Sequence, residues 1–303
     1  MGLMLDPQES ARTIFRQPRD ALEPHAFALD MAERWALERA SRLSADRFRL
    51  TSFWYLDYIR QHVPGERKTR YRMRLAQAEN YGIACGPASA LRDTDQALVG
   101  EDSREILKDR RFRDDIDRTV LVDLVIWHVS AAADHQVMLD QTLREKYALR
   151  SRLFGDEADL ILRRKGFDAI KGSKPRIHVI GATAGIIGAL IDRGFEVTAT
   201  DMGADVVGEK LGGVTVCDET ENDRLIKAAD LVIITGMTLP NRTLPILIKS
   251  AKTHNTSTVI WAITGRNFGY YFTEQGVDCV ISDPSPFLML PGPATIGIWR
   301  RKS

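Results

Sequence analysis

The chain of 303 residues is long enough for about two domains of roughly 150 residues, and its 44% hydrophobic content can form a sizeable core. Its 42 Lys and Arg residues nearly balance its 41 Asp and Glu residues, which excludes the strong positive field of a general nucleic-acid-binding protein. No stretch reaches the ~20 uninterrupted apolar residues of a membrane helix, and the three scattered cysteines form no disulfide framework or CxxC motif. We expect a cytoplasmic protein that acts on a small molecule and has neither nucleic acid nor membrane as a partner.

The first half of the chain, residues 1–170, has the pattern of a helical domain. Charged stretches carry apolar residues three or four positions apart, which is the spacing of one helix face. The predicted helices cover 26–43, 53–63, 116–129 and 135–149. The basic runs at 67–74 and 108–113 are predicted to be solvated helix faces and loops. This half is therefore expected to form a helical lid or substrate domain.

From Lys174 onward, short β-branched runs alternate with helical segments. Residues 176–201 are typical of a strand, a helix and a second strand. The later predicted elements are helices at 221–229 and 243–252 and strands at 230–235, 258–264, 277–282 and 294–299. Parallel strands need long crossovers, so this alternation predicts an α/β fold with a mostly parallel sheet. We expect residues 171–303 to form a Rossmann-like cofactor-binding domain similar to class I methyltransferases, with the boundary within 163–175.

Glycines mark the junction between the first of these strands and its helix. In such sheets a ligand lies at the carboxyl edge of the first strand, beside the N–H groups of the helix N-terminus. A dinucleotide motif GxGxxG that ends at Gly188 needs glycine at the position of Thr183, so the dinucleotide interpretation is weakened. Close packing of the helix on the strand is the alternative role for these glycines.

The same segment partly resembles the first motif of S-adenosylmethionine (SAM) methyltransferases, as Gly181-x-Thr183-x-Gly185 with Thr in place of the middle glycine. Asp201 ends the second strand, where nucleotide- and SAM-binding proteins place a carboxylate that accepts hydrogen bonds from ribose hydroxyls. Asp218 follows the third strand, where related folds contact adenine. Together these residues favour a nucleoside-containing ligand.

The fourth strand supplies further polar residues at the same edge, followed by Asn241 and Thr243 at the start of a helix. By the switch-point rule they belong to the same crevice, although Asn-x-Thr is also a good helix cap. The fifth strand ends in Thr264–Asn267, and the aromatic residues that follow are expected to shelter a cation beside the crevice. The predicted cofactor-binding residues are Gly181, Thr183, Gly185, Asp201, Met202, Asp218, Thr235, Gly236, Thr238 and Asn241.

The succession GATAG, TATDM, ADLVIITGMTLPNRTLPILIKSAK, VIWAITG and GVDCVISDP resembles the Rossmann-like family that is named for heavy-metal chelation. No metal ligands are assigned, because the softer donors, His178, His254, Cys217 and Cys279, have no obvious metal spacing. The whole chain also resembles bacterial SAM-cyclising enzymes that make azetidine-2-carboxylate, in which a methyltransferase-like domain carries an N-terminal helical lid. That resemblance implies SAM as the cofactor and the release of methylthioadenosine.

Cyclisation of SAM requires a neutral amine, a sulfonium held over aromatic faces and the exclusion of water. The predicted catalytic residues of the lid are Tyr55, Asn80, Tyr81 and Asp134, although aromatic residues at helical spacing are also typical of a core. Three alternatives stay open: a conventional small-molecule SAM methyltransferase, a non-catalytic metal- or metallophore-binding protein, and an NAD(P) oxidoreductase. The product and the oligomeric state, including a homodimer, also stay open.

Overall fold

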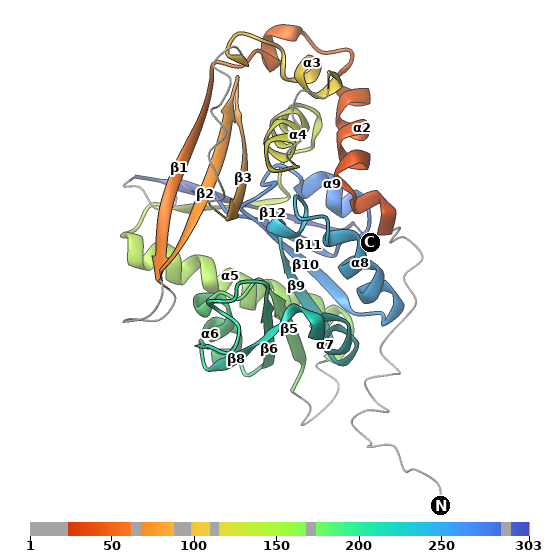
Figure 1. The fold of residues 1–303 in the computed structure, drawn as a ribbon. Helices are drawn as coiled ribbons and strands as arrows, with labels where there is room; N and C mark the ends of the chain where they lie inside the picture. The colour runs from red at the N-terminus through yellow and green to blue at the C-terminus, as the bar shows by residue number, and fades with distance from the viewer. Residues whose placement is uncertain are drawn as a thin grey trace, which may run out of the picture.

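The computed structural model describes residues 24–61, 68–87, 98–109, 115–167, 174–285 and 292–302. These segments form a three-stranded antiparallel sheet and a nine-stranded sheet, with helices packed against both (Figure 1). The smaller sheet and helix α4 lie over one end of the larger sheet, at the carboxyl ends of its central strands. None of the described helices is both long enough and apolar enough to cross a bilayer.

The larger sheet has the strand order β4-β12-β11-β10-β9-β5-β6-β8-β7. Its parallel strands are β5 (Arg176–Ile180), β6 (Glu196–Asp201), β8 (Val214–Asp218), β9 (Leu231–Thr235), β10 (Ser257–Ala262) and β11 (Cys279–Ser282). Antiparallel strands β7 (Lys210–Leu211), β12 (Ala294–Arg300) and β4 (His135–Leu139) flank them. The predicted α/β fold with a mostly parallel sheet is confirmed.

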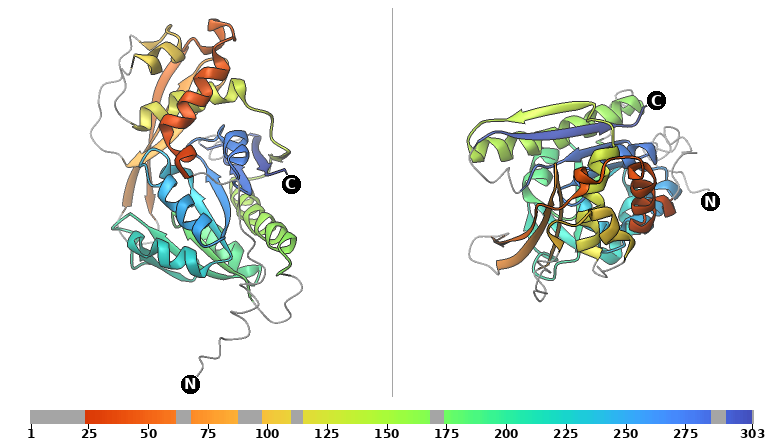
Figure 2. Two further views of the ribbon diagram at one scale, coloured as in Figure 1. Left: turned by 90° about the vertical axis from the view of Figure 1, so that its right-hand side faces the viewer. Right: turned by 90° about the horizontal axis from the view of Figure 1, so that it is seen from above.

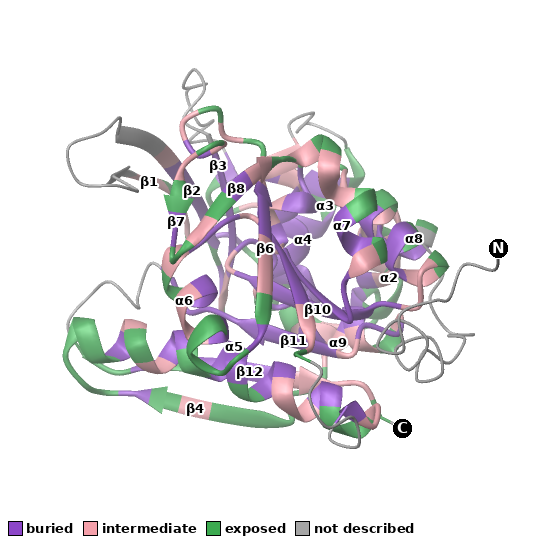
Figure 3. Ribbon diagram, turned by 90° about the horizontal axis from the view of Figure 1, so that it is seen from below, coloured by how far each residue is buried: buried purple, intermediate pink, exposed green. Residues whose placement is uncertain are grey.

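The central strands are buried on both faces, as their continuous apolar runs predict. In β9, Leu231 and Ile233 join a core with helices α5 (Leu143–Arg164) and α6 (Ala184–Asp192). Val232 and Ile234 instead join a core that includes α8 (Leu244–Thr253). The two remaining helices of this half are α7 (Asn222–Ala228) and α9 (Gly269–Glu274). Figure 2 shows α5 and α8 on opposite faces of the sheet, and Figure 3 shows the buried centre beside the exposed edge strand β4.

Two of the helices predicted in the first half are present. They are α2 (Leu29–Ala40) and α4 (Asp115–Val129), and the shorter elements near them are η1 (Pro24–Phe27), η2 (Ala45–Phe48) and α3 (Ser103–Lys108). Helix α4 is buried on most faces, as its dense apolar run predicts. It lies so close to the smaller sheet that a Cβ atom on Gly82 would be 2.0 Å from the backbone oxygen of Val120. The glycine therefore sets the packing of α4 on this sheet.

The prediction of an entirely helical N-terminal domain is wrong. Strands β1 (Ser52–Gln61), β2 (Lys68–Gln77) and β3 (Tyr81–Pro87) replace the helix predicted over 53–63 and the solvated face predicted over 67–74. The reason is a period of two in β2, where Arg72 and Arg74 alternate with Met73 and Leu75. Both apolar residues are fully buried, and each arginine forms an ion pair with an aspartate, so neither face of this strand resembles a helix surface.

The helix predicted over 135–149 is also wrong in its first part. Residues 135–139 form β4, and α5 begins only at Leu143, where Thr142 and Glu145 form a capping box. Both elements precede the predicted boundary at residue 171, yet β4 pairs with β12 and α5 packs on α6. The first half of the chain thus contributes an edge strand and a covering helix to the larger sheet.

Candidate functional site

A cavity of about 870 Å³ lies at the carboxyl ends of β5, β6 and β9, and we call it the switch-point cavity. The strand order reverses there, because β6 and β8 lie on one side of β5 whereas β9 and β10 lie on the other. Crevices at such reversals are where open α/β sheets bind ligands. The smaller sheet and α4 cover the cavity with Tyr71, Cys85, Gly86 and Ile116.

Most of the predicted cofactor-binding residues lie together in this cavity. Those in its wall are Gly181, Thr183, Asp201, Met202, Thr235, Thr238 and Asn241. Gly185, Gly236 and Asp218 do not line it. Asp218 instead accepts hydrogen bonds from the N–H and hydroxyl groups of Thr220 at the start of a 3-10 turn, and these bonds lower the pKa of its carboxyl.

Two of the glycines have a steric reason to be glycine. Gly181 has a φ of 88°, and a Cβ there would lie 2.6 Å from Cγ2 of Thr235. A Cβ on Gly236 would lie 2.2 Å from the backbone oxygen of Thr264. The loops after β5, β9 and β10 can therefore approach one another closely at this edge of the sheet. A Cβ on Gly185 would lie 2.8 Å from the hydroxyl of Ser151, so this glycine allows α6 to pack closely on α5 and not on the strand as the alternative role predicted.

Asp201 ties two of these loops together. Its Oδ2 accepts a hydrogen bond from the N–H of Ala182 at 2.9 Å, and its Oδ1 accepts one from the N–H of Gly203 at 2.8 Å. Each carboxylate oxygen can accept a second hydrogen bond, so the position suits both a structural and a ligand-binding role. Asn241 accepts two hydrogen bonds from Thr243 in the turn just before α8, whereas Thr243, the N-cap residue, forms no side-chain hydrogen bond that caps the helix.

The ionisable lining of the switch-point cavity is acidic. Asp201, Asp205, Glu219 and Asp223 line it, and no Lys or Arg does among the residues that the structure describes. Oδ2 of Asp205 is shielded from solvent and accepts no hydrogen bond within the described part of the chain. Such a lining offers no counter-charge to phosphate groups, whereas it attracts a ligand with a positive centre.

The predicted catalytic residues lie outside this cavity. Tyr55 packs against two arginine side chains, with guanidinium carbons of Arg72 and Arg74 at 5.4 and 5.7 Å from its ring centre. Asn80 and Tyr81 lie where β2 turns into β3. Asp134 accepts a hydrogen bond from the N–H of Arg300 at 2.7 Å. The structure does not bring these four residues together with the predicted cofactor-binding residues.

The aromatic residues after β10 are also placed differently from the prediction. Phe268 and Tyr271 are buried in the core, where both pack against Phe272. Their apolar rings are therefore used to hold α9 and do not line the crevice. Among the residues that sequence reasoning missed are Tyr71, Cys85, Asp205, Glu219 and Asp223. Asp205 and Glu219 could have been found from their places just beyond Asp201 and Asp218.

The described residues contain no group of three or more His, Cys, Asp and Glu side chains arranged to hold a metal ion. Burial raises the pKa of the Cys85 thiol to about 12 and raises that of Cys279 well above its usual value. Burial likewise lowers the pKa of His178 to about 4, and the ring contacts Thr198 and Asn222 inside the fold. Two protonated thiols and an enclosed imidazole do not fit a soft-metal site.

Comparison with known proteins gives a family match over part of the chain. The model of the DUF364 family, described as "Putative heavy-metal chelation", matches residues 167–280. The predicted resemblance to that family is confirmed over these residues, and nothing in the comparisons supports the resemblance to SAM-cyclising enzymes. No curated protein matches the chain.

Two solved structures of DUF364 proteins of unknown function are similar to this chain. The first, from Pyrococcus horikoshii, is 14% identical, covers 90% of this chain and 99% of its own, and has a TM-score of 0.49. The second, from Desulfitobacterium hafniense, is 11% identical, covers 89% of this chain and 98% of its own, and also has a TM-score of 0.49.

Proposed function

We propose that the protein is an enzyme whose switch-point cavity binds SAM and cyclises it to azetidine-2-carboxylate, with release of methylthioadenosine. The observation that carries this proposal is the charge of the lining, in which four carboxylates occur without a described Lys or Arg. SAM is a nucleoside without phosphate groups and carries a sulfonium and an ammonium group. A dinucleotide would place its pyrophosphate in a cavity with four carboxylates, where the N–H groups at the start of α6 are the only described counter-charge, so the lining favours SAM over NAD(P).

The position of the cavity supports a Rossmann-like mode of binding. In chain order, the six parallel strands have the spatial order 3-2-1-4-5-6 of doubly wound nucleotide-binding sheets. Asp201 lies at the end of the second of these strands, where a carboxylate accepts hydrogen bonds from ribose hydroxyls. Ile180, Ile246 and Ile263 supply apolar surface that suits an adenine ring.

The reaction requires little from the protein beyond binding and a proton acceptor. The lone pair of the α-amine attacks the γ-carbon, the bond from that carbon to sulfur breaks, and its electron pair stays on the sulfur of methylthioadenosine. The α-ammonium must lose one proton before its nitrogen can attack, and we assign the acceptance of this proton to the carboxylate of Asp205, whose buried Oδ2 has no partner in the described part of the chain. Enclosure under Tyr71 and Cys85 would exclude water.

The test is calorimetric titration with SAM, S-adenosylhomocysteine and ATP, followed by incubation with SAM alone and mass spectrometry of the products. We expect SAM to bind at least about 10-fold more tightly than S-adenosylhomocysteine, which lacks the sulfonium, a difference of ~1.4 kcal/mol. Asp205→Asn should reduce this preference, whereas Asp192→Asn, at an exposed site outside the cavity, should preserve it. Methylthioadenosine with the cyclic amino acid supports the cyclase, and absence of SAM binding overturns the proposal.

A metal-binding function is the second candidate, because the matching family is described by heavy-metal chelation. The acidic lining would take a hard divalent cation more readily than a soft one, since its described acidic donors are carboxylate oxygens. Titration with the hard ions Mg²⁺ and Mn²⁺ and with Ni²⁺, Co²⁺ and Zn²⁺, in the absence of nucleosides, separates the two candidates. Tight binding of one of these ions, without binding of SAM, would favour the metal function.

A further inference from the structure

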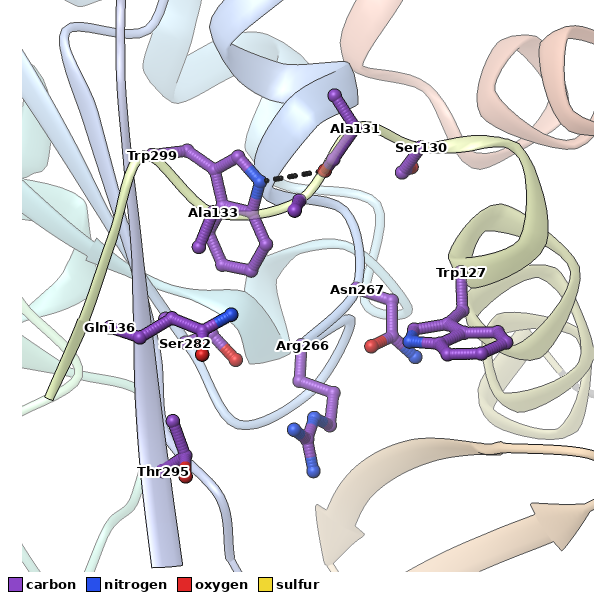
Figure 4. Close-up of a pocket in the computed structure, with 12 residues that line it drawn as sticks. Trp127, Ser130, Ala131, Ala133, Gln136, Arg266, Asn267, Ser282, Thr295 and Trp299 are labelled. Atoms are coloured by element: carbon purple, nitrogen blue, oxygen red, sulfur yellow. Dashed lines mark hydrogen bonds between the residues drawn. The ribbon is translucent and has the colours of Figure 1, made fainter. Parts of the chain in front are cut away.

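We infer that a second cavity, of about 470 Å³, binds a small carboxylate through the guanidinium group of Arg266. This Arg266 cavity lies between the end of α4, strands β4 and β12, and the loop after β10. Figure 4 shows the Arg266 side chain extended into it, with Gln136, Ser282 and Thr295 across the space. The inference does not depend on which ligand the switch-point cavity binds.

Arg266 has no acidic partner in the described part of the chain. Its Nε is shielded from solvent without a hydrogen bond, and no described carboxylate forms an ion pair with the guanidinium group. Its cation–π contact is with the ring of Tyr81, whose centre lies 4.5 Å from Cζ. A guanidinium group stacked on an aromatic ring keeps its in-plane N–H groups available for a carboxylate.

The acid that affects the pKa of Arg266 is Asp283, and its oxygens already accept other hydrogen bonds. Oδ2 accepts from Arg150 at 2.9 Å, and Oδ1 accepts from the N–H and hydroxyl groups of Ser285. Burial lowers the pKa of Arg266 to about 10, so the side chain still carries its charge at neutral pH. A half-buried charge without a partner is costly, which gives an anionic ligand an advantage at this place.

Buried arginines elsewhere in the described segments have the carboxylate partner that Arg266 lacks. Arg72 pairs with Asp57, Arg74 pairs with Asp117, and the N–O distances are 2.6 and 2.8 Å. The fold thus supplies a carboxylate to each of these buried cations, whereas no carboxylate of the described residues pairs with Arg266. A carboxylate from a bound molecule would complete the same kind of pair.

The walls of the Arg266 cavity indicate the rest of the ligand. Trp299 is fixed by a hydrogen bond from its Nε1 to the backbone oxygen of Ala131, and it packs where Gly269 has no side chain. Trp127 is 43% exposed although it is large and apolar. Two indoles and one guanidinium group suit a flat carboxylate with a single negative charge, and the neutral hydroxyls of Ser282 and Thr295 add donors without further charge.

The probe that we would use is benzoate, with benzamide as the uncharged analogue of the same shape and inorganic sulfate as a different anion. Binding is measured by calorimetry and by the change in tryptophan fluorescence on the full chain. We expect benzoate to bind at least 10-fold more tightly than benzamide and sulfate. Equal binding of benzoate and benzamide, or preference for sulfate, would overturn the assignment of a carboxylate site.

Two variants test the role of Arg266 itself. Arg266→Gln should lower benzoate affinity at least 10-fold and bring it to the level of benzamide, whereas Arg224→Gln, at an exposed arginine, should leave the affinity unchanged. In the absence of ligand, Arg266→Gln should keep or raise the melting temperature, because it removes a half-buried charge that has no acidic partner among the described residues. A lower melting temperature together with unchanged benzoate affinity would show a purely structural residue and contradict the inference.

Discussion

The two cavities of this molecule have opposite charge, although a short loop separates them. The switch-point cavity has four carboxylates and no Lys or Arg among its described lining residues, whereas the Arg266 cavity has an arginine and no described acid. The loop after β10 contributes Ile263 to the first and Arg266 to the second. A single loop can therefore line two cavities of opposite charge, because residues three positions apart in it face different cavities.

The largest expected effect is that of a substitution at Asp123, which holds the loop between the two cavities and should therefore affect both. Its fully buried carboxylate accepts hydrogen bonds from the N–H of Ile83 at 2.9 Å and from the N–H of Asn267 at 2.7 Å. Asp123→Ala leaves these buried donors without a partner, so we expect a loss of about 3–5 kcal/mol in the free energy of unfolding. Urea denaturation measures this loss of free energy. Ligand binding should be weakened in both cavities together.

The exposed Asp192→Asn variant is the control for this experiment, with an expected change within about 0.5 kcal/mol. A loss below about 1 kcal/mol for Asp123→Ala would show that the smaller sheet and the loop are held by other contacts.

The next largest expected effect is a pH dependence of the free energy of unfolding, caused by His178 beside the switch-point cavity. Burial lowers the pKa of His178 to about 4, and His178 contacts Asn222 and Thr200, which line that cavity. The unfolded chain has the ordinary value near 6.5, so between pH 6.5 and 4 it binds a proton that the folded chain does not. Stability is therefore full above about pH 6.5 and falls by up to ~3 kcal/mol as the pH decreases to 4.

Urea denaturation at pH 7, 5.5 and 4.5 tests this dependence, with His178→Gln as the matched variant. Carboxylates also titrate near the lower end of the range, so the quantity of interest is the difference between the two proteins. The variant should have the shallower slope, and parallel slopes would show that His178 is not the group responsible.

The smaller sheet shows why the fold was only partly predictable. Strand β2 carries a basic residue at every second position from Lys68 to Arg74, and a run of Arg and Lys is usually solvated. Asp57 and Asp117 come from β1 and α4, so the partners that allow Arg72 and Arg74 to be buried are remote in the sequence. The β-branched strands of the second half need no such partners, and their alternation with helices was sufficient to predict the sheet.

The candidate site was also predictable only in the part that the second half of the chain supplies. Gly181, Asp201 and Thr235 follow successive strand ends, and the switch-point rule alone places them at one edge. Tyr71 and Cys85 reach the same cavity from the smaller sheet, which sequence periodicity did not reveal. Arg266 was expected beside the crevice, but its orientation into a different cavity depends on the packing of β4 and α4.

A smaller effect is expected for Asp201→Asn, which should affect the switch-point cavity and leave the Arg266 cavity unchanged. The amide nitrogen replaces one carboxylate oxygen and faces either the N–H of Ala182 or that of Gly203, so one backbone donor loses its partner. We expect a loss of about 1–2 kcal/mol in stability and weaker SAM binding. Benzoate binding should not change, and a parallel loss of benzoate affinity would show that the two cavities are coupled through the sheet.

The smallest expected effect concerns the reactivity of the thiols, which reports whether the roof of the switch-point cavity stays closed. Cys85 lines the cavity but is only 3% exposed, and burial raises its pKa to about 12. Cys279 is fully buried, whereas Cys217 is partly exposed. A thiol reagent at pH 8 should therefore modify Cys217 in the native protein, and Cys85 and Cys279 only after denaturation, because the thiolate is the reactive form.

Mass spectrometry of the modified peptides identifies the sites and their rates. Rapid native modification of Cys85 would mean that the smaller sheet lifts from the larger one, so that the cavity is open to water for part of the time. The same assay bears on metal binding, because a thiol that stays protonated is not a metal ligand. If Zn²⁺ slowed the reaction at Cys217 alone, the metal would be bound at the edge of the sheet beside β8 and not under the roof, and the switch-point cavity would remain available for a nucleoside.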